Sequence, residues 1–211
     1  MSGFFFLRHG QTDMNIRHMM QGRVNTHLNE TGRRQARKAA EFMRENGICP
    51  DEIYTSPLVR TIETAEEATG QKRAVFKTEP LIVEMSFGIY EGTEVEKLHP
   101  DFYHDFFNDP VHCCMPDQAE TYEELLGRAR TFYEKILRLG VSEDKTRLYV
   151  SHGAFLHAFF IVVNEIPLEK MWDYPVDNAS IMQLVEENGK FRLKLIFEGY
   201  GNRTGNVLEE E

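Results

Sequence analysis

The residues from Phe4 to Gly10 combine a short apolar run with two side chains that could do chemistry. The apolar letters FFFL lead directly into Arg8, His9 and Gly10. A buried strand gains nothing from ending on a guanidinium and an imidazole, because burial removes the hydration of both groups. A bound anion would explain them, since arginine supplies fixed charge and neutral histidine can act as a nucleophile. The stretch therefore predicts a ligand site at the end of the first strand.

Three more residues of these chemical kinds follow other predicted strands. Arg60 lies in the first turn of the helix after the second strand, Glu84 follows the third strand, and His152 with Gly153 follows the fourth. Ligands of open α/β sheets bind beyond the carboxyl ends of the strands, so these side chains should converge at one edge. Helix N-termini at that edge add backbone N–H donors. The set predicts a site for a dianionic phosphate.

Taken singly, each of these residues has an ordinary structural explanation. Arg60 fits a solvated helix position, and His152 fits a hydrogen-bonded core histidine. The string Arg-His-Gly is short enough to arise by chance. The joint placement at the ends of successive strands favours the ligand site over these explanations.

Apolar periodicity and turn signals predict strands that alternate with helices along the chain. The expected strands are residues 3–7, 53–55, 74–78 and 147–151, followed by a hairpin of residues 180–186 and 191–197. The expected helices are residues 31–46, 57–69, 121–139 and 153–163. This alternation predicts an α/β fold, a three-layer sandwich whose central sheet is mostly parallel and gains an antiparallel edge from the hairpin.

Three of these helices carry recognisable start signals. Thr31 is expected to cap the first helix, and Ser56 is expected to cap the second, with Pro57 at its first position. Thr121 and Glu124 have the spacing of a capping box, in which each side chain satisfies a backbone N–H of the other residue.

The composition limits which partners the chain can bind. The 211 residues include 24 Lys and Arg against 34 Asp and Glu, a net charge of −10, so neither nucleic acid nor an anionic membrane is an expected partner. The apolar run 158–163 is too short to span a bilayer, and the first residues lack the basic start of a signal peptide. The odd count of three cysteines argues against a disulfide framework and favours a reducing cytoplasm. We expect one domain over residues 1–211 and leave a homodimer open.

Six sequence motifs, in this order, resemble those of the histidine phosphatase superfamily, the phosphoglycerate-mutase-like proteins. The motifs are LRHGQTDMN at 7–15, QG at 21–22, LNETGRRQA at 28–36, TSPLVRTIETA at 55–65, EMSFGIYEG at 84–92 and VSHGAFLHA at 150–158. They span nearly the whole chain, and they are specific for the superfamily but not for a substrate. The resemblance implies a phosphoglycerate-mutase-like fold and, among its members, the cofactor-independent phosphatase branch.

The resemblance also implies catalytic roles. His9 would attack phosphorus and carry the phosphoryl group as a phosphohistidine. Arg8, Arg60 and His152 would bind the equatorial oxygens and stabilise the charge of in-line transfer. Glu84 would protonate the leaving alkoxide and then take a proton from water. No metal ion and no other cofactor is required, because the arginines and histidines supply the positive charge.

A second group of residues would bind the substrate. Asn15 would donate a side-chain hydrogen bond to the phosphate, and Gly10 would let the backbone approach it closely. The carbonyl of Gly10 could in addition fix the tautomer of His9. Gln21, Gly22 and Gly153 belong to the matching motifs and complete the expected set.

The chain departs from the superfamily's mutases after the predicted acid. Those mutases continue with an Arg-His-Tyr-Gly run, whereas this chain has Met85 and Ser86. The basic groups that would hold a phosphorylated carboxylic acid are absent from this run, which favours a metal-independent phosphomonoesterase acting on a small phosphorylated metabolite. The alternatives are a phosphoglycerate-mutase-type phosphotransferase and a non-catalytic phosphate-binding domain. Many relatives also have arginine near the position of His157, for which helix packing is the simpler explanation.

Residues 94–120 are expected to form a helical insertion over the site. Their aromatic side chains, together with Met19 and Met20, could line an apolar wall that selects the substrate, or could simply pack the insertion onto the sheet. A zinc site is a weaker interpretation, since the spacing fits no standard ligand pattern. Its ligands would be His99, His104, His112, Cys113 and Cys114.

Overall fold

The central element of the molecule is one six-stranded sheet. The computed structural model describes residues 3–140 and 145–200, so residues 1–2, 141–144 and 201–211 of the predicted domain lie outside the described part. The sheet has the order β3-β2-β4-β1-β5-β6. Its strands are β1 (Gly3–Arg8), β2 (Glu52–Thr55), β3 (Lys77–Thr78), β4 (Thr146–Ser151), β5 (Ile181–Glu187) and β6 (Lys190–Phe197). The first four run parallel, and β5 pairs antiparallel with both β1 and β6, which confirms the predicted antiparallel edge.

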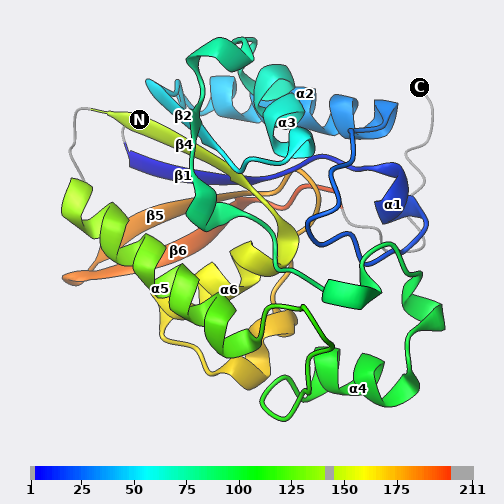
Figure 1. Cartoon of the computed structure of the whole chain (residues 1–211). Helices are drawn as coiled ribbons and strands as arrows, with labels where there is room; N and C mark the ends of the chain where they lie inside the picture. The colour runs from blue at the N-terminus through cyan, green and yellow to red at the C-terminus, as the bar shows by residue number, and fades with distance from the viewer. Residues whose placement is uncertain (1–2, 141–144, 201–211) are drawn as a thin grey trace.

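Helices cover both faces of this sheet and make the predicted three layers (Figure 1). One face carries α2 (Glu30–Glu45) and α3 (Val59–Thr69), and the other carries α5 (Tyr122–Leu139) and α6 (Gly153–Asn164). Two shorter helices, α1 (Asp13–Ile16) and α4 (Pro100–Asn108), lie beyond the carboxyl ends of the parallel strands (Figure 1).

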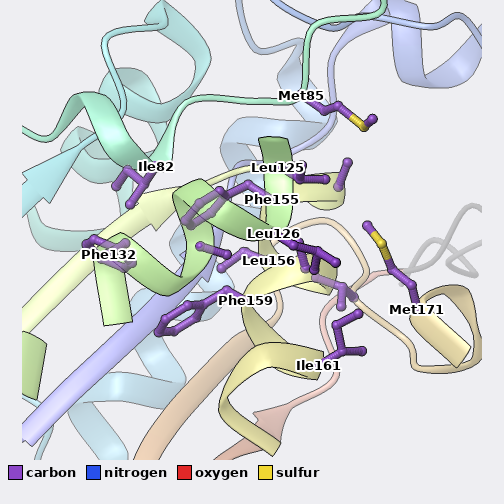
Figure 2. Close-up of a cluster of buried hydrophobic side chains, with 14 of the residues drawn as sticks. Ile82, Met85, Leu125, Leu126, Phe132, Phe155, Leu156, Phe159, Ile161 and Met171 are labelled. Carbon is purple, nitrogen blue, oxygen red and sulfur yellow. The ribbon is translucent and has the colours of Figure 1, made fainter. Parts of the chain in front are cut away.

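Strand β1 supplies both hydrophobic cores because successive side chains of a strand point to opposite faces. Phe4 and Phe6 belong to the cluster shared with α5 and α6, whereas Phe5 and Leu7 belong to the cluster under α2 and α3. Figure 2 shows part of the first cluster, where α6 packs its apolar residues against α5. An all-apolar strand buried on both faces is typical of a central parallel strand.

The observed start of α2 differs from the expected one. Its cap is Asn29, whose Oδ1 accepts a hydrogen bond from the Gly32 N–H at 2.8 Å, so Thr31 lies two residues too late to be the cap. Helix α5 begins as predicted, with Thr121 and Glu124 in a reciprocal capping box.

Two further expectations need correction. Helix α3 begins at Val59 after Leu58, whose side chain makes no cap bond. The Ser56 hydroxyl lies before the helix, where it accepts from the Leu58 N–H at 3.3 Å and from the ring of His152. The third strand is limited to Lys77–Thr78, since residues 73–75 form a short 3₁₀ turn. As an edge strand with exposed side chains, β3 has little apolar contact to extend it.

The segment 94–120 contains the 3₁₀ turn Val95–Lys97 and helix α4, and it stands beside the carboxyl edge of the sheet (Figure 1). Isolated bridges attach its two ends to the rest of the chain, Glu94 to Met19 and Ala119 to Phe87. Its status as an insertion remains a prediction. Within residues 3–140 and 145–200, no helix has the length and apolar character needed to cross a bilayer.

Candidate active site

A cavity of about 520 Å³ opens at the carboxyl ends of β1 and β4. Its lining includes every predicted site residue except Gly10 and His152. These lining residues are Arg8, His9, Asn15, Gln21, Gly22, Arg60, Glu84 and Gly153. The convergence expected from the strand-end rule is therefore present, with the two exceptions lying behind the cavity wall.

His9 is held as a neutral imidazole with one nitrogen available. The side chain is 2% exposed, and its Nδ1 lies 2.7 Å from the carbonyl oxygen of Gly10. A carbonyl can only accept, so Nδ1–H donates to it and the lone pair is left on Nε2. Burial, followed by the positive charges of Arg60 and Arg8, lowers the pKa of His9 well below its ordinary value. The ring is thus in the protonation state that a nucleophile needs.

Gly10 is required by a neighbouring helix, a reason additional to the expected close approach to phosphate, which stays a prediction. A Cβ atom at Gly10 would lie 2.3 Å from the carbonyl oxygen of Gly32, in the first turn of α2. The Gly10 N–H donates to the Thr64 hydroxyl of α3 at 3.0 Å. The loop that carries His9 is thereby fixed between two helices, and the Gly10 carbonyl lies 2.7 Å from His9 Nδ1, the position from which it can set the tautomer.

Arg60 is fully buried and connects three parts of the site. Its Nη2 donates to the Gly22 carbonyl at 2.8 Å, its Nη1 donates to the Val24 carbonyl at 2.8 Å, and its Nε donates to His152 Nδ1 at 3.1 Å. Burial lowers its pKa to about 10, with Glu84 opposing that shift, so the guanidinium stays charged at neutral pH. A charged side chain this well fixed is a ready anion receptor.

Arg8 supplies the second guanidinium of the cavity. Its Nη1 donates to the Val176 carbonyl, and its Nε is buried without a hydrogen-bond partner in the described part of the chain. Gly153 leaves room for it, since a Cβ there would lie 3.3 Å from Arg8 Cζ. Burial lowers the pKa of Arg8, and Glu84 and Asp177 oppose that shift. An unpaired buried N–H donor beside a cavity is costly unless a ligand accepts from it.

His152 lies behind Arg60 and does not line the cavity. Its Nδ1 accepts from Arg60, so the proton must be on Nε2, which donates to Ser56 Oγ at 2.7 Å. The ring packs edge-on against His9 with 5.3 Å between centroids. Burial and then Arg60 lower the pKa of His152 well below its ordinary value. With both nitrogens engaged, His152 orients Arg60 and His9, and its direct contact with phosphate remains a prediction.

Glu84 is held by backbone N–H groups at the start of α6. Its Oε1 accepts from Met85 at 2.9 Å and from Phe155 at 3.0 Å, and its Oε2 accepts from Ala154 at 3.3 Å. The carboxyl group is 7% exposed and lines the same cavity as His9. The N-terminus of a helix is a favourable place for a carboxylate, so the fold fixes the position of the predicted acid.

The predicted substrate-binding residues are also fixed by their neighbours. Asn15 Oδ1 accepts from the backbone N–H and the hydroxyl of Thr12, which sets the orientation of its amide. Gln21 Oε1 accepts from the Thr26 hydroxyl at 3.0 Å. Gly22 has φ +50° and would place a Cβ 2.2 Å from Glu91 Oε1, so both its conformation and its packing require glycine.

Arg128 of α5 positions the acid segment, and sequence reasoning missed it. Its Nη1 donates to the carbonyls of Leu81 and Val83, directly before Glu84, while Nε and Nη2 pair with Glu120. An arginine on a helix with charged neighbours has no sequence signal that distinguishes this role from a solvated position.

The outer wall of the cavity is aromatic and contains residues that sequence reasoning did not single out. Phe87 and Trp172 line it beside the expected Tyr103, Phe106 and Phe107. Trp172 is the only tryptophan of the chain, and that rarity was the available signal. Its Nε1 donates to the Phe106 carbonyl at 2.9 Å. Phe106 is 1% exposed and packs in the core while Tyr103 is 44% exposed, so the segment both packs and lines the cavity, and its selection of a substrate stays a prediction.

The histidines of the insertion do not meet at a common point. His104 and His112 are exposed and pair with the neighbouring carboxylates of Asp105 and Asp109. Among the described residues, no group of three or more potential ligands could hold a metal ion.

Comparison with known proteins places this geometry in a family. Residues 4–199 match the sequence model of the histidine phosphatase superfamily (branch 1). The chain is 30% identical to an uncharacterized phosphatase of Bacillus subtilis, over 92% of this chain and 93% of that protein. It is 28% identical to phosphoserine phosphatase 1 of Hydrogenobacter thermophilus, over 90% and 89%. The structure of a mycobacterial glucosyl-3-phosphoglycerate phosphatase in complex with VO3 superposes with TM-score 0.77 at 26% identity, covering 92% of this chain and 96% of that one.

Proposed function

This chain belongs to the histidine phosphatase superfamily, and we propose that it hydrolyses a small phosphate monoester, without a metal ion, through a phosphohistidine at His9. The observation that carries the proposal is the bond from His9 Nδ1–H to the Gly10 carbonyl, which leaves the Nε2 lone pair as the nucleophile. Arg8 and Arg60 line the same cavity and supply positive charge for the phosphate oxygens.

In the first step, His9 Nε2 attacks phosphorus and the ester P–O bond breaks. The electron pair goes to the leaving oxygen, which takes a proton from Glu84 in its acid form. In the second step, water attacks the phosphorus, Glu84 takes the proton of that water, and the P–N bond breaks. Inorganic phosphate leaves, and His9 is neutral again. Arg8 and Arg60 stabilise the charge on the equatorial oxygens in both steps.

The mutase alternative has less support from the cavity. Residues 85–86 bring no cation to it, because Met85 is buried and the Ser86 hydroxyl bonds to Glu91 and to the Gln118 carbonyl. A non-catalytic phosphate-binding domain would not need an acid such as Glu84, which is held at the cavity by three backbone N–H groups. Hydrolysis uses the His9 nucleophile, the two arginines and the Glu84 acid together.

We propose a small phosphorylated metabolite as the partner and the cytoplasm as the setting. The cysteines Cys49, Cys113 and Cys114 are free thiols in the structure, which is consistent with a reducing compartment.

The test is phosphate release from 4-nitrophenyl phosphate, with and without EDTA and vanadate. We expect activity that survives EDTA and is inhibited by vanadate, together with an acid-labile, base-stable phosphate on His9 after acid quenching. His9→Ala should lose both activity and label, whereas His104→Ala, an exposed histidine paired with Asp105, should keep both. Loss of activity on chelation, with rescue by Zn²⁺ or Mg²⁺, would overturn the metal-independent mechanism.

A further inference from the structure

We infer that this active site selects phosphate monoesters whose leaving alcohol is aromatic or apolar and carries no negative charge, and that it rejects phosphorylated carboxylic acids such as phosphoserine. The inference rests on the proposed phosphatase function and names the substrate class for the same site. It sets this chain apart from relatives that are named phosphoserine phosphatases.

Much of the cavity lining is apolar and comes from several separate segments. Met19 and Met20 line one side, and Val95 lies next to them. Backbone hydrogen bonds join these two segments, from Met20 N–H to the Thr93 carbonyl at 2.9 Å and from Val95 N–H to the His18 carbonyl at 2.8 Å. The segments therefore form one continuous surface against which an apolar group can pack.

Aromatic rings form another part of this lining. Trp172 packs 5.4 Å from Phe107 and 4.8 Å from the ring of His157, measured between ring centroids. Its indole N–H is used within the protein, by the Phe106 carbonyl and the Tyr122 hydroxyl, so the ring offers the cavity its apolar surface. A fixed aromatic surface gains most by stacking on a flat apolar group.

Positive charge in the cavity is concentrated where the phosphate binds. Arg8 and Arg60 are the arginines of the lining, and in the described part of the chain no lysine belongs to it. Both ring nitrogens of His157 already face backbone carbonyls, Nδ1 that of Gly153 at 2.8 Å and Nε2 that of Tyr174 at 3.0 Å, so neither is turned to a substrate. His18 lines the cavity as an exposed histidine. A carboxylate on the leaving group thus finds no lysine and no arginine beyond the two that bind the phosphate.

Glu96 adds a negative charge to the same wall. It lines the cavity as an exposed side chain of the turn Val95–Lys97, and no ion-pair partner for it is found among the described residues. The neighbouring Glu94 pairs with Arg17 and with Lys97 and is not part of the lining. A second anionic group on the substrate would be repelled by Glu96, whereas an ammonium group would be attracted.

The experiment compares three phenyl phosphates of matched shape at pH 8, where exposed imidazoles are neutral. They are 4-ethylphenyl phosphate, 4-(carboxymethyl)phenyl phosphate and 4-(2-aminoethyl)phenyl phosphate, whose charged groups are separated from the ring by methylene. We expect kcat/KM for the neutral ester to exceed that for the carboxylate by about tenfold, a difference of about 1.4 kcal/mol. Phosphoserine should be hydrolysed more slowly than 2-phenylethyl phosphate, which is also an alkyl ester.

Two sets of variants connect the selection to the named residues. Glu96→Gln should lower the neutral-to-carboxylate ratio by about 2- to 5-fold, the range of an exposed charge pair, and Glu96→Lys should lower it further. Glu94→Gln is the matched control and should leave the ratio unchanged. Trp172→Ala should lower the ratio of kcat/KM for 2-phenylethyl phosphate to kcat/KM for ethyl phosphate by about tenfold. Trp172→Phe keeps an aromatic ring and should lower this ratio less. It serves as the test if the alanine variant does not fold.

The outcomes separate this inference from the proposed function. If no ester releases phosphate and no phosphohistidine forms, the proposed function fails, and the inference fails with it. If the neutral esters are hydrolysed but the carboxylates react as fast or faster, the phosphatase stands and the inference is overturned. An unchanged ratio in Glu96→Gln and Glu96→Lys would likewise overturn the role of Glu96.

Discussion

Replacing Glu84 by glutamine tests whether its carboxyl group delivers the proton to the leaving oxygen. The amide oxygen can take the place of Oε1 and accept from Met85 and Phe155. The amide nitrogen then stands at Oε2, where it faces the N–H of Ala154, now 3.3 Å from the oxygen. This donor-to-donor contact removes one hydrogen bond and should cost about 1–3 kcal/mol of folding free energy. That is affordable for a domain with about 5–15 kcal/mol of stability, so the variant should fold.

The catalytic loss should depend on the leaving group. Loss of a general acid typically costs about 10²–10⁴-fold in rate when the leaving group needs a proton, as an alkoxide does. A 4-nitrophenolate departs without one, so that ester should lose much less. The assay is kcat/KM for a series from alkyl to nitrophenyl phosphates, because kcat/KM reports the steps up to formation of phosphohistidine. Urea unfolding of the same preparation measures the structural cost separately.

Glu91→Gln is the matched control for this experiment. Its Oε1 also accepts from backbone N–H groups, those of Arg23 at 2.9 Å and Phe87 at 3.2 Å, but Glu91 does not line the cavity. With its amide oxygen in the place of Oε1, the variant can keep these bonds, so it should lose little stability and show no leaving-group dependence. Equal losses across the whole ester series in Glu84→Gln, or a leaving-group dependence in Glu91→Gln, would refute the assignment of Glu84 as the acid.

Three further outcomes are expected. Gly32→Ala places a Cβ 2.1 Å from the Gln11 carbonyl, so it should lower the free energy of unfolding by about 1–3 kcal/mol and disturb the His9 loop. Gly127→Ala has open space around it and should raise the free energy of unfolding slightly. Urea unfolding measures the stability of both variants, and kcat measures the effect on the loop. Because burial lowers the pKa of His157 to about 4, the unfolded chain binds a proton there first as pH falls. The folding free energy that neutral His157 contributes is complete above about pH 6.5 and is lost toward about pH 4, at most about 3 kcal/mol. The free energy of unfolding in urea should therefore fall less steeply below pH 6.5 in His157→Gln than in the wild type. Equal slopes would contradict this. Arg60→Met should lower kcat/KM at least as much as Arg8→Met, since it also releases the carbonyls of residues 22 and 24, and a smaller effect would argue against its role as the connecting group.

The sequence predicted the site better than it predicted the wall around it. Strand ends are set by local hydrophobic pattern, and in a parallel sheet those ends must meet, so Arg8, His9 and Arg60 could be brought together without coordinates. The exchange of caps at α2 was not predictable in the same way, because Asn29 and Thr31 are both good caps and tertiary contacts choose between them.

The internal partners of the site were also beyond reach from sequence. Ser56 has the pattern of a helix cap, yet its hydroxyl accepts from His152, 96 positions later in the chain. Trp172 meets Phe106 only because a 3₁₀ turn after α6 lies against α4. Such contacts depend on how elements dock, and neither composition nor periodicity carries that information.

The place of β1 in the sheet has a consequence for how the protein is made. β1 is synthesised first, but its neighbours in the sheet are β4 and β5, and its Gly3 pairs with Thr146. At about 5–20 residues per second, a ribosome needs about 7–30 s to travel between those two residues. During that time the FFFL run has no strand to pair with, so the nascent chain exposes an apolar segment to which chaperones can bind. The nucleophile at the end of β1 therefore cannot be held in its observed place until β4 and β5 have been synthesised.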